Sequence, residues 1–444
     1  MCLRPLYPVC KQLPESLLTR SLLVRVEQDL VLHDQGEGLM HKRNLTFGIG
    51  LVATITVIAC AANEMDDMAA SQDGATMAPM FEVNPFWPKP LPNHWIQGAT
   101  IGVDVDSRDD VWLVHRNTPD QFAGRTELGS AQDPPLSECC SPAPPVLHFD
   151  SDGNLVDSWG GPTDTGEYVW PVSNHGITVD HMDNVWIGGN GGPDRQILKF
   201  SRDGDFLNQF GESGAQNSSL SEVNFGRVAK VFADPEENEI YVADGYLNRR
   251  VAVIDGSTGE MKRFWGAYGN EPSDDRTPGY TPGETPPQQF RTPVHCAELS
   301  NDGLLYVCDR PSNRISVFQR DGTFVNEVVI APHTLSQGAT WDIDFSPDDD
   351  QTWMYVADGQ NMKVYVMDRE TLEIVYSFGD GGRQPGTWFA VHSIAVDSEG
   401  NIYTTETYEG KRIQKFNYMG MGEVTTKGMD MGAPWPADRR RIGQ

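Results

Sequence analysis

Three histidines occupy the same place in three similar stretches of the chain. The stretches are Ser-Asn-His-Gly at 173–176, Pro-Val-His-Cys at 293–296 and Ala-Val-His-Ser at 390–393. In each stretch the histidine precedes a few strand-type residues, an acidic turn and a second apolar strand. Three imidazoles around one point, with the fourth position open, form a catalytic zinc site that acts as a Lewis acid toward a hydroxyl or a water. The predicted ligands are His175, His295 and His392, with zinc as the expected metal; iron, copper or nickel also suit imidazole ligands.

These histidines meet only if a repeated unit places them around a common axis. Aligning the chain on an apolar strand, an Asp turn, an apolar–aromatic strand, a third strand, an Asp-Gly turn and a closing Phe/Trp-Gly gives six copies. Four strands recurring at roughly 40 residues are typical of a propeller blade, and six blades close into a ring. The copies are 98–160, 174–211, 226–266, 293–330, 338–379 and a sixth that starts near Val391. We therefore predict an all-β fold, a six-bladed β-propeller with four-stranded blades.

The first strand of a blade lines the channel of a propeller, so histidines on blades two, four and six are expected about 120° apart around the axis. For any one of them, the alternative is a channel-lining histidine that only hydrogen-bonds its neighbours. The sixth blade has clear strands only to residue 417. Its missing fourth strand is expected from residues 81–83 or from the C-terminal segment near Val424, which would close the ring.

The ends of the second strands supply further polar side chains at the same end of the ring, namely Arg116, Tyr246 and Arg310. Two arginines and a tyrosine beside a metal suit an anionic substrate, because guanidinium binds carboxylate and a phenol acts as proton donor or base. The alternatives are arginines paired with an Asp of the next blade and a tyrosine that only marks a turn. Two long loops, 117–145 and 267–292, are expected on this face as well.

The chain carries a strong negative charge. Asp and Glu number 63 against 34 Lys and Arg, a formal net charge of −29. Such a surface repels phosphate backbones and anionic lipid, so we expect no nucleic-acid partner. The 44 glycines and 30 prolines, with almost no helical periodicity, agree with an all-β chain punctuated by turns.

The first eighty residues are expected to precede the fold. A short basic head, an apolar run and the sequence Val-Ile-Ala before Cys60 are typical of a lipoprotein signal whose cysteine is acylated. The alternative is a plain cleaved signal without lipid. We therefore expect an exported protein that faces the periplasm or the cell exterior and contacts the membrane only through Cys60. The predicted division is a non-native extension at 1–39, the signal at 40–59, a flexible acidic tether at 60–80, the propeller at 81–430 and a tail at 431–444.

Four cysteines lie within the predicted propeller, in what is expected to be an oxidising compartment. Cys296 and Cys308 are equidistant from Asp302 in a hairpin turn, so they should face each other across two strands, and a disulfide is expected there. Cys139 and Cys140 lie in a Pro-rich loop. They form either a vicinal disulfide or two separate thiols.

Taken together, these motifs resemble those of the NHL-repeat six-bladed propellers and, within them, those of the peptidyl-α-hydroxyglycine α-amidating lyases (peptidylamidoglycolate lyases). The resemblance covers roughly residues 95–417. The shared pieces are His-Arg at 115–116, His-Gly at 175–176, Asp-Gly-Tyr-x-Asn-x-Arg at 244–250, Pro-Val-His at 293–295, Asp-Arg at 309–310 and Val-His at 391–392.

The resemblance implies cleavage of the C–N bond of a carbinolamide, with release of an amide and glyoxylate. It implies that the three histidines hold zinc, that Tyr246 deprotonates the substrate hydroxyl, and that Arg116 and Arg310 bind and polarise the carboxylate end. The family has an aspartate directly after the third histidine, where this chain has Ser393. The resemblance therefore does not extend to the family's calcium site.

The predicted function is that of a metal-dependent lyase acting on a small carboxylated carbinolamide, such as a peptidyl-α-hydroxyglycine. One alternative keeps the metal and makes the reaction that of a different lyase or a hydrolase. The other is a non-catalytic propeller that presents a surface to protein or glycan partners. Nothing in the sequence indicates the oligomeric state.

Overall fold

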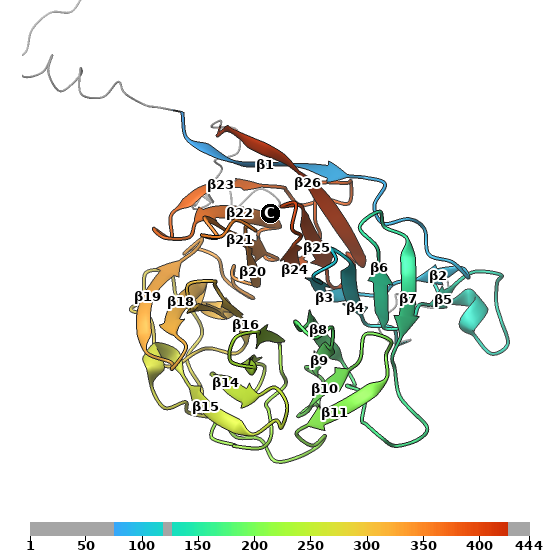
Figure 1. The fold of residues 1–444 in the computed structure, drawn as a ribbon, viewed down its shortest axis with the longest axis horizontal. Coiled ribbons are helices and arrows are strands. Elements are labelled where there is room, and N and C mark those ends of the chain that lie inside the picture. The colour runs from blue at the N-terminus through green and yellow to red at the C-terminus, as the bar shows by residue number, and fades with distance from the viewer. Residues whose placement is uncertain (1–74, 119–126, 425–444) are drawn as a thin grey trace, which may run out of the picture. The chain divides into compact units, whose positions relative to one another are not determined.

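Six four-stranded antiparallel sheets stand around a common axis in the computed structural model (Figure 1). The structure describes residues 75–118 and 127–424. Within this part of the chain the helical segments are single 3-10 turns, and none is long and apolar enough to cross a membrane. The predicted all-β, six-bladed propeller with four-stranded blades is confirmed.

Each blade runs outward from its first strand, which lies nearest the axis (Figure 1). Blade one contains β3 (Thr100–Val105), β4 (Val111–His115), β6 (Val146–Phe149) and β7 (Leu155–Trp159). Blade two contains β8 (Asn174–Val179), β9 (Val185–Gly189), β10 (Ile197–Phe200) and β11 (Phe206–Phe210). Blade three contains β12 (Lys230–Asp234), β13 (Glu239–Asp244), β14 (Arg250–Asp255) and β15 (Met261–Trp265).

The second half of the ring repeats this order. Blade four contains β16 (Val294–Leu299), β17 (Leu304–Asp309), β18 (Arg314–Gln319) and β19 (Phe324–Val329). Blade five contains β20 (Asp342–Phe345), β21 (Trp353–Asp358), β22 (Lys363–Asp368) and β23 (Ile374–Phe378). Blade six contains β24 (Val391–Val396), β25 (Ile402–Glu406), β26 (Arg412–Glu423) and β1 (Met77–Asn84). The remaining elements are β2 (Trp95–Ile96), β5 (Ser141–Pro142), η2 (Gly129–Ala131), η3 (Ala267–Gly269) and η4 (Arg310–Ser312).

A repeated hydrogen bond explains the sequence pattern of strand, Asp turn and aromatic strand. The indole of Trp112 donates to Asp106, the indole of Trp186 donates to Asp180, and the phenol of Tyr403 donates to Asp397. In each case the aspartate follows the first strand and the aromatic residue lies on the second. A buried indole or phenol needs a polar partner, so this pair fixes the hairpin while the ring packs into the core.

The two ends of the described chain close the ring together. β1 pairs with β26 from Met77 opposite Glu423 to Asn84 opposite Lys415, and so supplies the fourth strand of blade six. This confirms the first of the two predicted sources of that strand. Because β1 begins at Met77, residues 77–80 belong to the sheet rather than to the predicted tether. The predicted extension, the signal with Cys60 and the tail at 431–444 lie outside the described residues.

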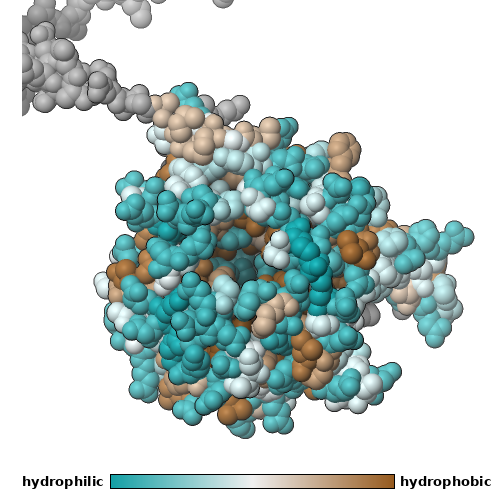
Figure 2. Space-filling view, viewed as in Figure 1, coloured by the Kyte–Doolittle hydropathy of each residue, from teal (hydrophilic) through white to brown (hydrophobic). Residues whose placement is uncertain are grey.

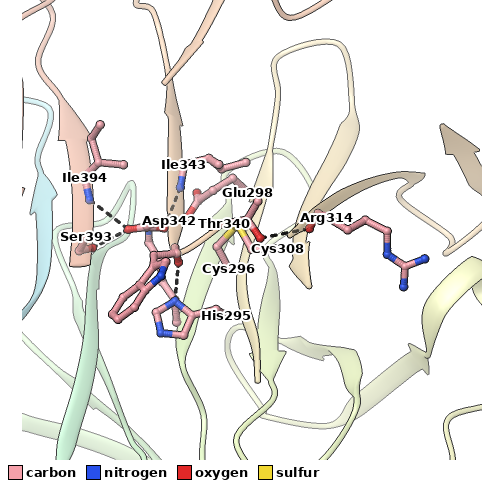
Figure 3. The surroundings of a disulfide bond; sticks show 12 residues. His295, Cys296, Glu298, Cys308, Arg314, Thr340, Asp342, Ile343, Ser393 and Ile394 are labelled. Carbon is pink, nitrogen blue, oxygen red and sulfur yellow. Dashed lines mark hydrogen bonds and ion pairs between the residues drawn. A yellow bond between two sulfur atoms is a disulfide. The ribbon is translucent and has the colours of Figure 1, made fainter. Parts of the chain in front are cut away.

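Two disulfides join the four cysteines of the propeller. Cys296 on β16 is bonded to Cys308 on β17, as predicted, next to the axis of the ring (Figure 3). Cys139 and Cys140 form a vicinal disulfide just before β5, which decides between the two predicted alternatives. The first bridge ties together the two inner strands of blade four, immediately beside the predicted ligand His295.

Candidate metal centre

The three predicted ligands meet at the axis. Each is the second residue of a first strand, on β8, β16 and β24, and each exposes 4% of its surface or less. Their ring centroids are 4.8 to 5.2 Å apart, and one nitrogen of each lies within 4.8 Å of the others. The set is His175, His295 and His392. Side chains separated by two blades in the sequence therefore converge on one point.

An irregularity in strand pairing accompanies each of the three histidines. The register of first strand against second strand shifts between His175 and Ile177, between Val294 and Ala297, and between Val391 and Ile394. A β-bulge bends its strand and re-aims the neighbouring side chains. At the first of these sites, a Cβ on Gly176 would lie 2.5 Å from the carbonyl oxygen of Ala229, so only glycine fits after His175.

Backbone carbonyls of the following blade set the tautomer of two of the three imidazoles. Nδ1 of His175 donates to the carbonyl of Ala229 at 2.7 Å, and Nδ1 of His295 donates to that of Trp341. For His392 the corresponding carbonyl is that of Ile101, but Nδ1 of His392 makes no hydrogen bond of normal geometry among the described residues. With the proton on Nδ1, the lone pair of Nε2 is available to a metal.

Burial keeps the three imidazoles neutral, the form that binds a metal. It lowers the pKa of His175 to about 3, with further lowering by the charge of Arg116. The pKa values of His295 and His392 also lie well below the ordinary value, because of burial first and then the charges of neighbouring arginine and histidine side chains. Neutral imidazoles with free Nε2 atoms are the donor set of a transition-metal site.

The phenol of Tyr246 lies between two of these nitrogens. Its oxygen is 3.0 Å from Nε2 of His175 and 3.0 Å from Nε2 of His295. Both nitrogens are acceptors when Nδ1 carries the proton, and a hydroxyl has one proton to donate. One acceptor is therefore left unsatisfied, whereas a cation among the three Nε2 atoms would satisfy all of them. The residues present fit a bound metal ion.

Arg310 brings a buried positive charge to the same point, and no carboxylate of the described residues forms an ion pair with it. It exposes 5% of its surface, its Nη1 donates to Tyr246 at 3.2 Å, and its Nη2 donates to the side-chain oxygen of Gln337 at 2.9 Å. Its Nε is buried and makes no hydrogen bond. The alternative prediction, a structural pair with an Asp of the next blade, does not describe this residue. A buried guanidinium in this state attracts an anion.

Arg116 lies in the loop after β4, near His175 and His392. Its Nη2 donates to the side-chain oxygen of Asn190 at 2.9 Å, and its charge contributes to the low pKa values of His175 and His392. The structure thus gathers all six side chains singled out in the sequence around one centre. The roles proposed for them are a separate question, addressed below.

A second group of potential ligands is filled by an arginine of the chain. Asp106, Asp110 and His148 lie together beside Trp112. The guanidinium of Arg202 forms ion pairs with both carboxylates. We interpret this group as a structural link between blades one and two.

Sequence reasoning missed a buried charge network further along the axis. The ammonium of Lys230 on β12 lies 2.6 Å from Glu298 on β16 and 3.0 Å from Asp342 on β20. Asp342 also accepts hydrogen bonds from the Ser393 hydroxyl and the Ile394 amide on β24 (Figure 3). The signal available in the sequence was a charged residue inside each of several apolar first strands.

Two further buried carboxylates depend on the same ammonium. Burial raises the pKa of Asp104 to about 6 and that of Asp344 to about 7, and Lys230 counteracts both shifts. Burial also raises the pKa of Glu298 well above its ordinary value. These groups bind protons in the folded protein that they release in the unfolded chain, so their ionisation opposes folding as the pH rises from about 4 to about 7.

Replacing Lys230 by methionine should therefore destabilise the protein most at high pH. We expect a loss of about 3–5 kcal/mol at pH 8, because the carboxylates stay buried without their cation. The loss should be at least about 1 kcal/mol smaller at pH 5, where protonation relieves their repulsion. Urea unfolding at both pH values measures it. Lys262→Met, at a side chain that is 38% exposed and pairs with Glu239, is the matched control and should cost under about 1 kcal/mol. Equal losses in the two variants would contradict this account.

Comparison with known proteins finds low-identity relatives of two kinds, NHL repeat-containing proteins and amidating enzymes. No protein-family model matches the chain. NHL repeat-containing protein 3 of Mus musculus is 24% identical over 355 residues, which cover 76% of this chain and 84% of that protein. Peptidyl-alpha-hydroxyglycine alpha-amidating lyase 1 of Drosophila melanogaster is 24% identical over 361 residues, 76% of this chain and 60% of that protein. The resemblance predicted from the motifs is confirmed, at low identity.

The match to the amidating enzymes is partial in length. Peptidyl-glycine alpha-amidating monooxygenase B of Xenopus laevis is 23% identical over 244 residues, 53% of this chain and 25% of that protein. Among solved structures, virginiamycin B lyase from Staphylococcus aureus has a TM-score of 0.45 and 13% identity, covering 76% of this chain and 99% of that one. A likeness of that size carries no functional argument.

Proposed function

We propose that this chain, an NHL-repeat six-bladed β-propeller with low-identity relatives among the amidating lyases, is a metal-dependent carbon–nitrogen lyase. The substrate class is a small carboxylated carbinolamide of the peptidyl-α-hydroxyglycine type. One observation carries the proposal: a phenol and a buried guanidinium lie beside three converging imidazoles, and no carboxylate in residues 75–118 or 127–424 pairs with that guanidinium. The residues are Tyr246, Arg310 and the ligands His175, His295 and His392.

Each side chain of the site has a proposed role in this reaction. The substrate carboxylate binds Arg310, with Arg116 as the second guanidinium of the site. Tyr246, as phenolate, takes the hydroxyl proton, and the electron pair left on oxygen forms the carbonyl while the C–N bond breaks. Tyr246 then returns that proton to the departing amide nitrogen, which regenerates the base. Arg310, 3.2 Å from the phenol oxygen, would stabilise the negative charge on ionised Tyr246. A zinc or similar ion held by the three imidazoles would supply Lewis acidity toward the hydroxyl.

The direct test is to supply purified protein with an N-acyl α-hydroxyglycine and measure glyoxylate. We expect glyoxylate and the amide in equal amounts, together with one transition-metal ion per chain by elemental analysis. Release of neither product from metal-loaded protein would contradict the lyase. If the protein instead turns over other carbinolamides or esters, the metal site belongs to a different lyase or a hydrolase.

Gln337 should control the affinity of the site for a carboxylate. Its side-chain oxygen accepts from Arg310 and its amide nitrogen donates to Tyr408 at 2.7 Å, so a neutral group holds the guanidinium in place. Gln337→Glu keeps the shape but gives Arg310 a carboxylate of its own. We expect KM to rise at least about 10-fold with kcat within about 3-fold, because a charge-assisted pair competes with the substrate. Gln337→Met, which adds no charge, should raise KM less; a Glu variant with unchanged KM would contradict the assignment.

A second function is favoured by NHL repeat-containing protein 3, a relative named for its repeats and not for an activity. In that reading the propeller is a scaffold for protein or glycan partners, and the outer loops carry its function. The triple variant of His175, His295 and His392 to alanine distinguishes the two. Under the lyase proposal it abolishes glyoxylate release, whereas a scaffold would keep its partners.

We also propose that the protein is exported and anchored through an acylated Cys60, a position outside the described residues. Two disulfides in the propeller support an oxidising compartment. Labelling with a radioactive fatty acid tests the anchor. Cys60→Ser should abolish the label and release the protein from the membrane fraction, and retention of both would contradict the proposal.

A further inference from the structure

A large cavity is lined by residues of blades three to five, several of which are close neighbours along the chain of residues of the metal centre. It has a volume of about 960 Å³ and lies under the Pro-rich loop 267–292. Four of its lining residues are close in sequence to residues of the site. Pro311 follows Arg310, and Ser336 precedes Gln337. Thr292 lies three residues before His295, and Arg249 lies three residues after Tyr246. The cavity is thus placed to receive the part of a substrate that extends beyond the reacting carbon.

The charge of this cavity is opposite to that of the protein. Three arginines line it, Arg249, Arg276 and Arg291, and no Asp or Glu is among the lining residues. The chain as a whole carries a net charge of −29. A cationic recess in so acidic a molecule raises the local concentration of anions and favours carboxylates over neutral ligands.

The three guanidiniums are not equivalent. Arg291 is buried and fully engaged, with Glu284 at 2.7 Å, the Pro278 carbonyl at 2.8 Å and the Ser312 hydroxyl at 2.9 Å. It anchors the loop and contributes no net charge. The other two differ from it, because neither forms an ion pair within 4 Å among the described residues.

Arg249 and Arg276 leave donors for a ligand. Nη1 of Arg249 donates to the backbone carbonyl of Asp274 at 3.1 Å, and its buried Nε has no hydrogen-bond partner among the described residues. The Asp274 carboxylate accepts from the Ser219 amide, and the charge of Arg249 contributes to its lowered pKa. Arg276 is exposed and makes no hydrogen bond or ion pair within the described part of the chain. Beside them, Tyr280 and Leu335 supply apolar surface for a short carbon chain.

We propose that this cavity binds the N-acyl part of the substrate and selects acyl groups that carry a carboxylate, such as an acidic residue preceding the hydroxyglycine. The inference rests on the proposed lyase reaction, in which Arg310 already holds the terminal carboxylate. Arg276 and Arg249 pair with the second carboxylate, and Tyr280 and Leu335 contact the methylene groups between them. The substrate class is then a dicarboxylate, with one anion at each end of the scissile bond.

The test compares two uncleavable dipeptides, N-acetyl-Glu-Gly and N-acetyl-Gln-Gly, by calorimetry on the full-length, metal-loaded protein. We expect the glutamyl ligand to bind at least about 10-fold more tightly, with a preference that shrinks in 0.5 M salt as for partly exposed charges. Arg276→Ala should reduce the preference to about 3-fold or less, and Arg276→Glu should abolish it. Arg108→Ala, at an exposed arginine that pairs with Asp183 in a turn after a first strand, is the matched control and should leave it intact.

Equal binding of the two dipeptides by the wild type, or a preference that survives Arg276→Glu, overturns the inference. Glyoxylate release from the corresponding α-hydroxyglycines, measured in parallel, separates this inference from the proposed function. A preference for the glutamyl ligand without glyoxylate release would support the role of the cavity and contradict the proposed lyase activity. Glyoxylate release with equal kcat/KM from both substrates would support the lyase activity and contradict the proposed selectivity of the cavity.

Discussion

Replacement of His295 by alanine should deprive the protein of its metal and lower glyoxylate release by more than about 100-fold. Changes to groups that merely orient a ligand cost 10- to 100-fold in metal affinity or activity, so removal of one of three ligands should cost more. His295 is suited to the test because its Nδ1 proton is held by the Trp341 carbonyl and its Nε2 faces the centre. Elemental analysis of the purified variant should find well under one ion per chain.

The control for this experiment is another histidine on the same end of the ring. His333 is exposed, between β19 and β20, and belongs to no group of potential ligands in the described residues. His333→Ala should keep both metal and activity. Treatment of the wild type with a chelator should mimic His295→Ala, and activity should return on addition of zinc. A metal-free wild type with full activity would exclude the metal from the reaction.

The fold and the site differ in how far the sequence predicts them. Six blades, the closing strand at residues 81–83 and the Cys296–Cys308 bridge follow from local patterns, because alternation, turn residues and loop lengths act over a few residues. The proximity of His175 and His392 also follows from the sequence, because in a closed ring the number of a blade fixes its angular position around the axis. The repeat thus carries long-range information that a single strand does not.

The bulges and the charge network could not be predicted in the same way. A register shift at His175 depends on which carbonyl of blade three faces its Nδ1, and that is decided by packing between blades. The ion pairs of Lys230 with Glu298 and Asp342 join three blades, so no window of sequence contains them. Ser393 shows the consequence: its hydroxyl bonds to Asp342, a carboxylate supplied by a different blade from its own.

Tyr246→Phe should separate the proton transfer from metal binding. The substitution removes only the oxygen that lies 3.0 Å from two ligand nitrogens and 3.2 Å from Arg310, and leaves the ring in place. General acid–base catalysis by a positioned side chain contributes about 10²- to 10⁴-fold, so we expect kcat to fall by that amount. The metal content should stay at one ion per chain, and KM should change less than about 3-fold, because Arg310, held in place by Gln337, still binds the carboxylate.

The matched control is Tyr408→Phe, which removes a hydroxyl from the rim of the same site. Its oxygen accepts a hydrogen bond from Gln337, which in turn contacts Arg310, so Tyr408 does not touch the ligand histidines in this chain of contacts. We therefore expect a change in KM without a large change in kcat. Steady-state kinetics on the same N-acyl α-hydroxyglycine measure kcat and KM of both variants. If Tyr246→Phe kept kcat within about 3-fold, the hydroxyl proton would have to leave by another group, and the placement of the phenol between two imidazole nitrogens would need a purely structural reason. If the variant lost its metal, Tyr246 would be a ligand as well, because its oxygen is the atom nearest to both Nε2 acceptors among the contacts of these two histidines.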